Sequence, residues 1–313
     1  MIKLEISSLQ FILSSNQAVE MAPFIGSTIR GVFGNILKDS CCVEPRGKCS
    51  ECMLRNRCVY TYLFESGWYF SNGERQQSGV PQPYVFEPTI YDNAEMNPGQ
   101  AEIKLGLQLF GNSIDYLPVF MHCIKKISQW GLGKNRIAYE LERVEDLFGQ
   151  KQVWHKGSAR MIKRPQTKTW DDYRKEAQSK NIIKRCQIEL ITPLRMKKEG
   201  HLQSNLDFTT VIKAIIRRWN LLNKYYGTGE KNDNSEIINS AAAIPSGTLN
   251  LHWQEMERYS RRQDQRMMLG GMMGIMECSG ELNSFLPWLL LGEDIHIGKN
   301  ASFGLGKYKL TLM

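Results

Sequence analysis

The sequence has no run of apolar residues long enough to cross a membrane, which takes roughly 18 in a row. Its opening segment, MIKLEISSLQFILSSNQ, has one lysine before alternating apolar residues and lacks the basic, apolar and small-residue order of a signal peptide. These two absences predict a cytoplasmic protein. A disulfide framework is not expected there, because that compartment keeps thiols reduced.

Two nucleotide-binding motifs are missing as well. The phosphate loop of nucleotide hydrolases needs G-x-x-x-x-G-K followed by Ser or Thr and a helix, but here Lys299 precedes Asn300 and Lys307 precedes Tyr308. The dinucleotide fingerprint opens a helix after a strand, whereas the glycine-rich segment near the C-terminus leads into a predicted strand. Both interpretations are therefore excluded.

Basic residues outnumber acidic ones, 40 against 32, and the net charge of +8 suits a polyanionic partner. The interval from Gln150 to Arg185 holds eleven basic and three acidic residues, so it accounts for the whole excess. It also shows little apolar periodicity. We therefore predict a basic linker at residues 151–182 between two domains at 1–150 and 183–313.

Both halves of the chain show the same predicted order of strand, helix, strand, strand, helix, strand. In the first half the strands are expected at 2–13, 84–90, 102–110 and 137–147 and the helices at 24–38 and 114–130. In the second half the strands are expected at 186–196, 249–256, 272–279 and 306–312 and the helices at 208–226 and 282–291. The tripeptide G-K-N precedes the closing strand of each half. This repeat predicts an α+β fold of tandem ferredoxin-like (βαββαβ, RRM-like) domains.

The segment HIGKNASFGLGKYKL combines glycines with lysines just before the last strand. Gly298, Gly304 and Gly306 allow positive φ and let a ligand approach the main-chain N–H groups, while Lys299 and Lys307 add positive charge. The combination predicts a loop that cradles a phosphodiester. The alternative is that the glycines only form a tight turn before an edge strand.

Five of the eight cysteines lie within residues 41–58. Cys42, Cys49, Cys52 and Cys58 give the spacing C-x6-C-x2-C-x5-C, with Cys41 as a rival for the first position. Four thiolates make a closed structural zinc site, although an iron–sulfur cluster could use the same ligands. We predict a structural metal that holds an insertion at about residues 39–81 of the first domain, and no catalytic metal.

Several segments carry a resemblance to a known family. The ending LLLGEDIHIGKNASFGLGKYKL and the preceding RYSRRQDQRMMLGGMMGIMECSGEL are similar to the C-terminal half of the CRISPR-associated endoribonucleases that process repeat RNA, in the RAMP superfamily. The segments TIRGVFGNILKDSCC and CSECMLRNRCVYTYLFE resemble the N-terminal half of a branch that has a cysteine cluster after the first helix. The likeness covers most of the chain and is weakest from Gln150 to Lys180.

The resemblance implies recognition of CRISPR repeat RNA and one metal-independent cut in each repeat of the precursor. In this family the 2′-hydroxyl next to the scissile phosphate is the nucleophile, and the products have 2′,3′-cyclic phosphate and 5′-hydroxyl ends. The alternative from another class is a non-catalytic RNA-binding subunit of a CRISPR effector complex, which would share the fold, the glycine-rich loop and the charge.

Many relatives place a catalytic histidine in or just after the first helix, but this chain has no histidine before His122. In one hypothesis His296 is the acid–base group and Lys299 stabilises the transition-state charge. In the other the acid and base are not histidines, and Arg30, Lys38 or a tyrosine orients the RNA. His296 could instead end a helix and bond a carbonyl group. His122 lies in an apolar stretch and is expected in a core or interface.

Cations near the predicted loops and helices are the candidates for RNA contact. The predicted RNA-binding residues are Arg30, Lys38, Lys134, Arg136, Arg258, Arg261, Arg262, Gly298, Gly304, Gly306 and Lys307. The predicted helix at 208–226 also shows Lys213, Arg217, Arg218 and Lys224 on its polar side. For this helix an RNA-binding face and an ordinary solvated face are equally supported.

Overall fold

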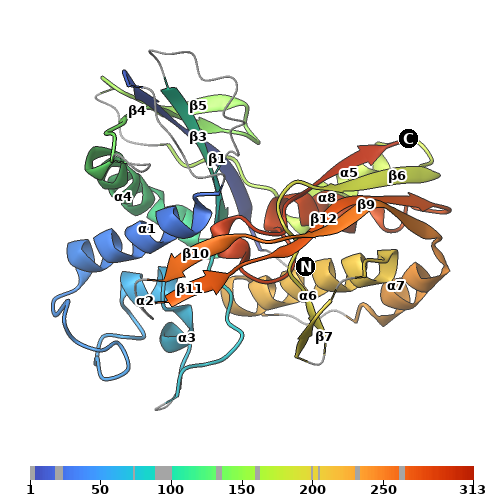
Figure 1. The fold of residues 1–313 in the computed structure, drawn as a ribbon, viewed down its shortest axis with the longest axis horizontal. Coiled ribbons are helices and arrows are strands. Elements are labelled where there is room, and N and C mark those ends of the chain that lie inside the picture. The colour runs from blue at the N-terminus through green and yellow to red at the C-terminus, as the bar shows by residue number, and fades with distance from the viewer. Residues whose placement is uncertain are drawn as a thin grey trace. The chain divides into compact units, whose positions relative to one another are not determined.

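A computed structural model describes residues 4–17, 24–72, 75–88, 101–131, 136–158, 163–198, 200–203, 205–229, 233–260 and 265–313. The chain divides into two compact units, the N-terminal unit Glu5–Thr167 and the C-terminal unit, which is Lys168–Met313 together with Leu4 (Figure 1). Among the helices described, none is both long and apolar enough to span a membrane.

The N-terminal unit is built on an antiparallel sheet with the strand order β2-β3-β1-β4-β5. Its strands are β1 (Ile6–Ser15), β2 (Tyr84–Pro88), β3 (Ala101–Phe110), β4 (Glu140–Asp146) and β5 (Lys151–His155). Its helices are α1 (Gly26–Cys41), α2 (Val59–Leu63), α3 (Ser66–Tyr69), the 3-10 helix η1 (Gly111–Tyr116) and α4 (Leu117–Trp130). Strands β1 to β4, with α1 and α4 between them in sequence, form the βαββαβ order, and β5 adds an edge strand.

Alternating apolar residues place one face of this sheet under α1 and α4. Leu9, Phe11 and Leu13 of β1 are buried, as their period-two spacing requires. Phe33 of α1 stacks on Phe120 of α4, with the ring centroids 4.9 Å apart. The two helices therefore close the core of the N-terminal unit.

The C-terminal unit has a four-stranded antiparallel sheet with the order β13-β6-β12-β9. Its strands are β6 (Arg185–Leu190), β7 (Lys197–Lys198), β8 (His201–Leu202), β9 (Ser246–Gln254), β10 (Glu257–Ser260), β11 (Gln265–Met268), β12 (Gly271–Ser279) and β13 (Tyr308–Leu312). Its helices are α5 (Trp170–Gln178), α6 (Phe208–Tyr226), α7 (Ser235–Ser240), η2 (Ala241–Ala243), α8 (Leu286–Ile295) and η3 (Ala301–Phe303). The strand order repeats that of β4-β1-β3-β2 in the other unit, which confirms the tandem ferredoxin-like fold.

Helix α6 has the bounds that its apolar spacing predicts. Asp207 caps it by accepting a hydrogen bond from the backbone N–H of Thr210 at 2.6 Å. Ile215 and Trp219, one turn apart, are buried. The polar positions between the buried ones are left on the opposite face.

Residues 151–182, predicted as a basic linker, instead hold β5 and α5. Strand β5 pairs with β4, and Val153 is buried in the N-terminal unit. Helix α5 belongs to the C-terminal unit, where Trp170 lies 4.2 Å from Trp288 of α8 between ring centroids. Val153, Tyr173 and Ala177 of this interval are thus each buried in a core, and the boundary falls between Thr167 and Lys168.

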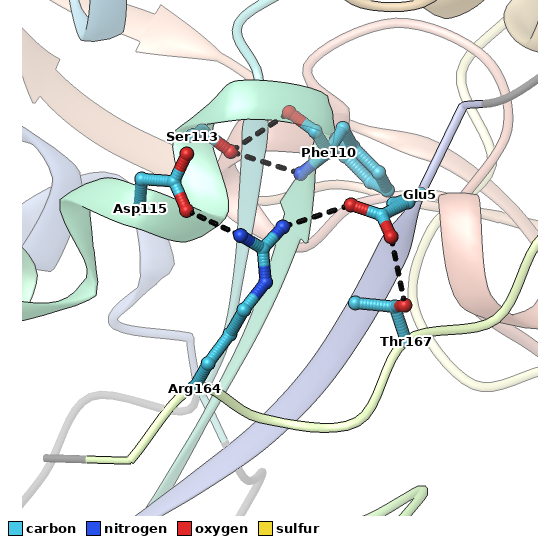
Figure 2. A network of polar contacts seen from close by, with 6 residues as sticks. All are labelled: Glu5, Phe110, Ser113, Asp115, Arg164 and Thr167. Carbon is cyan, nitrogen blue, oxygen red and sulfur yellow. Dashed lines mark hydrogen bonds and ion pairs between the residues drawn. The ribbon is translucent and has the colours of Figure 1, made fainter.

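The segment before that boundary is tied to the N-terminal unit by a polar network (Figure 2). The Arg164 guanidinium donates to Asp115 and to Glu5, each at 2.8 Å, and the Thr167 hydroxyl donates to Glu5 at 3.3 Å. Beside it, the Ser113 hydroxyl accepts from the N–H of Phe110 and donates to its carbonyl, which holds the turn into η1. The two acids therefore fix the course of the chain at residues 163–167.

Other cations between Gln150 and Arg185 are paired in the same way. The ion pairs are Lys156 with Glu140 at 2.5 Å, Lys168 with Glu176 at 2.9 Å, Arg174 with Asp171 at 3.8 Å, and Lys184 with Glu281. Much of the positive charge that concentrates here in the sequence is therefore balanced by acids of the same chain.

Candidate functional site

The glycine-rich segment packs against the residues that follow β6. Gly298, Gly304 and Gly306 have φ values of +84°, +94° and +73°, a region that favours glycine. A Cβ at Gly306 would collide with the carbonyl group of Ile297, and one at Gly298 would lie 2.6 Å from the carbonyl oxygen of Arg195. The glycines are therefore needed for close approach of protein backbone.

The main-chain N–H groups of this segment bond mostly to protein acceptors. Lys299 N–H donates to Arg195 at 2.8 Å, Gly306 N–H to Pro193 at 3.1 Å, and Lys307 N–H to the Thr192 hydroxyl at 2.9 Å. Gly304 N–H donates to Ala301 at 2.7 Å. The structure thus differs from the predicted phosphate cradle, because these amides are already used to join the segment to β6 and its loop.

His296 ends α8 and is completely buried. Its Nδ1 lies 3.1 Å from the carbonyl oxygen of Leu305, and its backbone has a φ of +56°. This is the arrangement in which a histidine ends a helix and bonds a carbonyl group. The prediction of His296 as the acid–base group does not fit this structure, because the ring has no surface that an RNA could reach.

The two lysines of the segment differ in their surroundings. Lys299 is exposed and makes no ion pair with the part of the chain that the structure describes. Lys307 is half-buried near Glu293. Burial raises the pKa of the Glu293 carboxyl group to about 7, although the positive charge of Lys307 acts in the opposite direction. Lys299 is therefore the more available cation for an anionic ligand.

The predicted RNA-binding cations of α1 contact protein groups. The Arg30 guanidinium lies 4.2 Å from the centre of the Phe64 ring, and its charge works against the burial that raises the pKa of Tyr84 to about 12. Lys38 Nζ donates to the carbonyl of Gly47 at 3.2 Å. Both cations hold the segment that follows α1, and their contact with RNA stays a prediction.

The remaining predicted cations are only partly covered. Arg136 is exposed with a φ of +51°. Arg258 lies in β10, where the structure describes the strand but not this side chain. Lys134, Arg261 and Arg262 lie outside the described residues.

The cysteines after α1 are neighbours, but they do not form a metal site as they stand. Cys41 donates to the carbonyl of Leu37 at 2.9 Å, and burial, followed by the charge of Cys58, raises the pKa of its thiol to about 11. In the described ranges no three Cys, His, Asp or Glu residues are grouped so that they could hold a metal ion. The predicted ligands Cys42, Cys49, Cys52 and Cys58 are free thiols, and the arrangement does not support the zinc prediction.

His122 differs from its expected place in a core or interface. It is exposed on α4, and its Nε2 lies 3.4 Å from the hydroxyl oxygen of Ser40 in the last turns of α1. Lys126, one turn further along α4, is exposed on the same side. Positions 122, 126 and 129 lie outside the buried stripe of α4. The helical spacing of the apolar residues therefore indicates, in the sequence itself, that His122 is exposed.

Comparison with known proteins gives matches over both units. A family model described as CRISPR-associated endoribonuclease Cas6 matches residues 188–308, and one described as an N-terminal domain matches residues 4–167. An uncharacterised protein of Archaeoglobus fulgidus is 25% identical over 296 residues, which are 93% of this chain and 92% of that protein. The match to the N-terminal domain model ends at residue 167, where the N-terminal unit ends.

Solved structures share the fold over nearly the whole chain. A Cas6 product complex has a TM-score of 0.60 and 12% identity, and the match covers 98% of this chain and 100% of that one. Thermus thermophilus Cas6 has a TM-score of 0.55 and 11% identity, covering 99% of each chain. A partial Cas6-RT-Cas1–Cas2 complex has a TM-score of 0.61 and 15% identity, covering 99% of this chain and 46% of the other.

Proposed function

The chain belongs to the CRISPR-associated Cas6 endoribonuclease family, and we propose that it binds CRISPR repeat RNA and cuts the precursor once in each repeat. The observation that carries the proposal is the Cas6 family match over the C-terminal unit. The repeated ferredoxin-like strand order in both units agrees with it. RNA binding and cleavage by this chain are proposals drawn from that membership.

The proposed reaction is an internal transfer that needs no metal. The ribose 2′-oxygen forms a bond to the adjacent phosphorus, and the bond from phosphorus to the 5′-oxygen breaks. A base takes the 2′-hydroxyl proton, and an acid protonates the departing 5′-oxygen. The products are a 2′,3′-cyclic phosphate and a 5′-hydroxyl. Positive charge beside the phosphate stabilises the transition state.

We propose His122 as the acid–base group of this reaction in place of His296. The His122 imidazole is exposed at the contact of α1 and α4, beside the Ser40 hydroxyl. The ammonium group of Lys126 stands one turn away to offset phosphate charge. Histidine has the near-neutral pKa that proton transfer at physiological pH requires. His155 and His252 are also exposed, but each bonds a carbonyl beside it in its own strand region.

A labelled repeat RNA incubated with the protein in EDTA tests the function. One discrete cut with a cyclic phosphate end is expected. Binding without a cut would instead identify a non-catalytic RNA-binding subunit of a CRISPR effector complex. Two observations favour that second candidate: α1 has no histidine, and His296 is completely buried.

Replacement of His122 by alanine tests the residue. The single-turnover cleavage rate is expected to fall by about 100-fold or more, because general acid–base groups contribute that much. The dissociation constant for RNA should stay within about twofold, since one exposed histidine adds little to binding. His155→Ala is the matched control, and an unchanged rate in His122→Ala would remove the residue from the mechanism.

A further inference from the structure

Helix α6 carries four cations and no acid along its 19 residues. Lys213, Arg217 and Lys224 are exposed, and we call these three residues the α6 stripe. Arg217 follows Lys213 by four positions and Lys224 follows Arg217 by seven, so the helical period puts the three residues on one face. The stripe is thus a continuous row of positive charge on the outside of the C-terminal unit.

Among the described residues, the cationic groups of the α6 stripe are not paired with acids. Over the residues that the structure describes, no ion pair involves Lys213, Arg217 or Lys224. Lys224 only lies over the ring of Tyr225, with its Nζ 5.0 Å from the ring centre. The fourth cation of the helix, Arg218, points inward, donates to the carbonyl of Ile295 at 3.3 Å, and has its pKa lowered to about 10 by burial.

The composition of this face favours a phosphate backbone over a protein partner. The core of a protein–protein interface is apolar and poor in lysine. Asn220, between Arg217 and Lys224, is the other exposed residue of α6, and none of the exposed large hydrophobic side chains among the described residues lies on this helix. With a rise of 1.5 Å per residue, the stripe spans roughly 16 Å, which covers several consecutive phosphates of a nucleic acid strand.

From these observations we infer that the α6 stripe binds the sugar–phosphate backbone of the repeat RNA. The inference rests on the proposed function, because it takes the substrate to be RNA. The contact is independent of base sequence and separate from the cleavage chemistry. Its contribution to affinity comes from release of counterions when the three cations neutralise phosphates.

The triple variant Lys213→Gln, Arg217→Gln, Lys224→Gln tests the inference. The probe is repeat RNA with a 2′-deoxyribose at the cut, so that binding is measured without cleavage. Log affinity falls as log salt concentration rises, and this slope should become less steep by about 2 to 3, since each phosphate contact contributes about 0.7 to 0.9.

The matched control removes three cations that are paired with acids: Lys156→Gln, Arg174→Gln, Lys184→Gln. This variant should keep the wild-type salt slope, although its net charge falls by the same amount. Arg217→Gln alone should make the salt slope less steep by about 0.7 to 0.9, the contribution of one phosphate contact. This single variant keeps the test available if the triple variant folds poorly.

The outcomes separate the two proposals. Wild-type protein that neither binds nor cuts repeat RNA would refute the proposed function. Wild-type protein that binds with a slope equal to that of the α6 variant would refute only the α6 inference. Equal losses in the α6 variant and the paired-cation control would also overturn it, because net charge rather than the stripe would then explain binding.

Discussion

The interval 150–185 and helix α6 are both rich in lysine and arginine, but the fold uses these cations differently. In the interval, Lys156, Arg164 and Lys184 pair with acids from other parts of their own unit, and Lys168 pairs with Glu176 of α5. In α6, the three cations of the stripe have no such partner among the described residues. A cluster of charge in sequence therefore indicates an anionic partner only when the tertiary structure leaves it unpaired.

The comparison can be sharpened with a partly buried acid that makes no ion pair among the described residues. Glu293 of α8 makes no ion pair in the described structure, and its Oε1 accepts a hydrogen bond from the Leu310 N–H at 2.7 Å. Burial raises the pKa of this carboxyl group from 4.5 to about 7, with Asp294 and Glu176 adding to the rise and Lys307 opposing it. Glu293→Gln keeps the acceptor oxygen and cannot ionise.

We expect the largest effect on stability from this substitution, and only at higher pH. The folded state holds a proton between pH 4.5 and about 7 that the unfolded state has lost, so this stabilising contribution is full below pH 4.5 and disappears as the pH rises through 7. Thermal unfolding should show Glu293→Gln and wild type within a degree or so at pH 4.5, and the variant higher by about 4 °C at pH 8. The same difference at both pH values would show that the carboxyl group does not titrate as described.

Smaller effects, on stability in one case and on RNA affinity in the other, are expected when a paired and an unpaired cation are each replaced by glutamine. Arg164→Gln breaks the ion pairs with Glu5 and Asp115, and it should cost about 1 kcal/mol of unfolding free energy, or about 2–4 °C in Tm. RNA affinity should not change. Arg217→Gln should do the reverse, with an unchanged Tm and a weaker, less salt-dependent affinity. Loss of affinity in Arg164→Gln would break the comparison.

The smallest effect on cleavage is expected from removal of metal. Because the proposed reaction uses the ribose hydroxyl and side chains, EDTA or phenanthroline should leave the single-turnover rate within about twofold. If the cysteines after α1 do bind zinc in solution, the loss should appear in Tm instead, since four thiolates leave no open position for water. Zinc content by mass spectrometry, measured beside both assays, checks this. A rate that collapses in folded, metal-free protein would contradict the mechanism.

The sequence alone predicted the fold because local apolar spacing was strong and repeated. Helix α6 has the predicted bounds, and the strand order of each unit follows from the predicted element order. The division at residues 151–182 was less accurate, because Val153, Tyr173 and Ala177 are too few to show a period and yet are buried. Each of them becomes recognisable as a core residue only beside the element that covers it.

The candidate site was much less predictable than the fold. The G-K-N segment and its glycines could be recognised, but not that their amides face Pro193, Arg195 and Thr192. The apolar neighbourhood of His122 in sequence predicts a core or interface position, whereas the side chain is exposed on α4. The side chains of a loop can turn to solvent or to protein with equal local preference, so their direction depends on what the fold places opposite them.

The amino-acid order by itself determined the two βαββαβ units, the family resemblance and the excess of positive charge. Apolar periodicity and composition are local properties, and they carry that information without any knowledge of distant contacts. Only the tertiary structure decided which histidine is buried, which glycines serve backbone packing and which cations remain unpaired. The physical reason is that burial, hydrogen bonding and ion pairing depend on groups far apart in sequence, which only the folded chain brings within a few ångströms of one another.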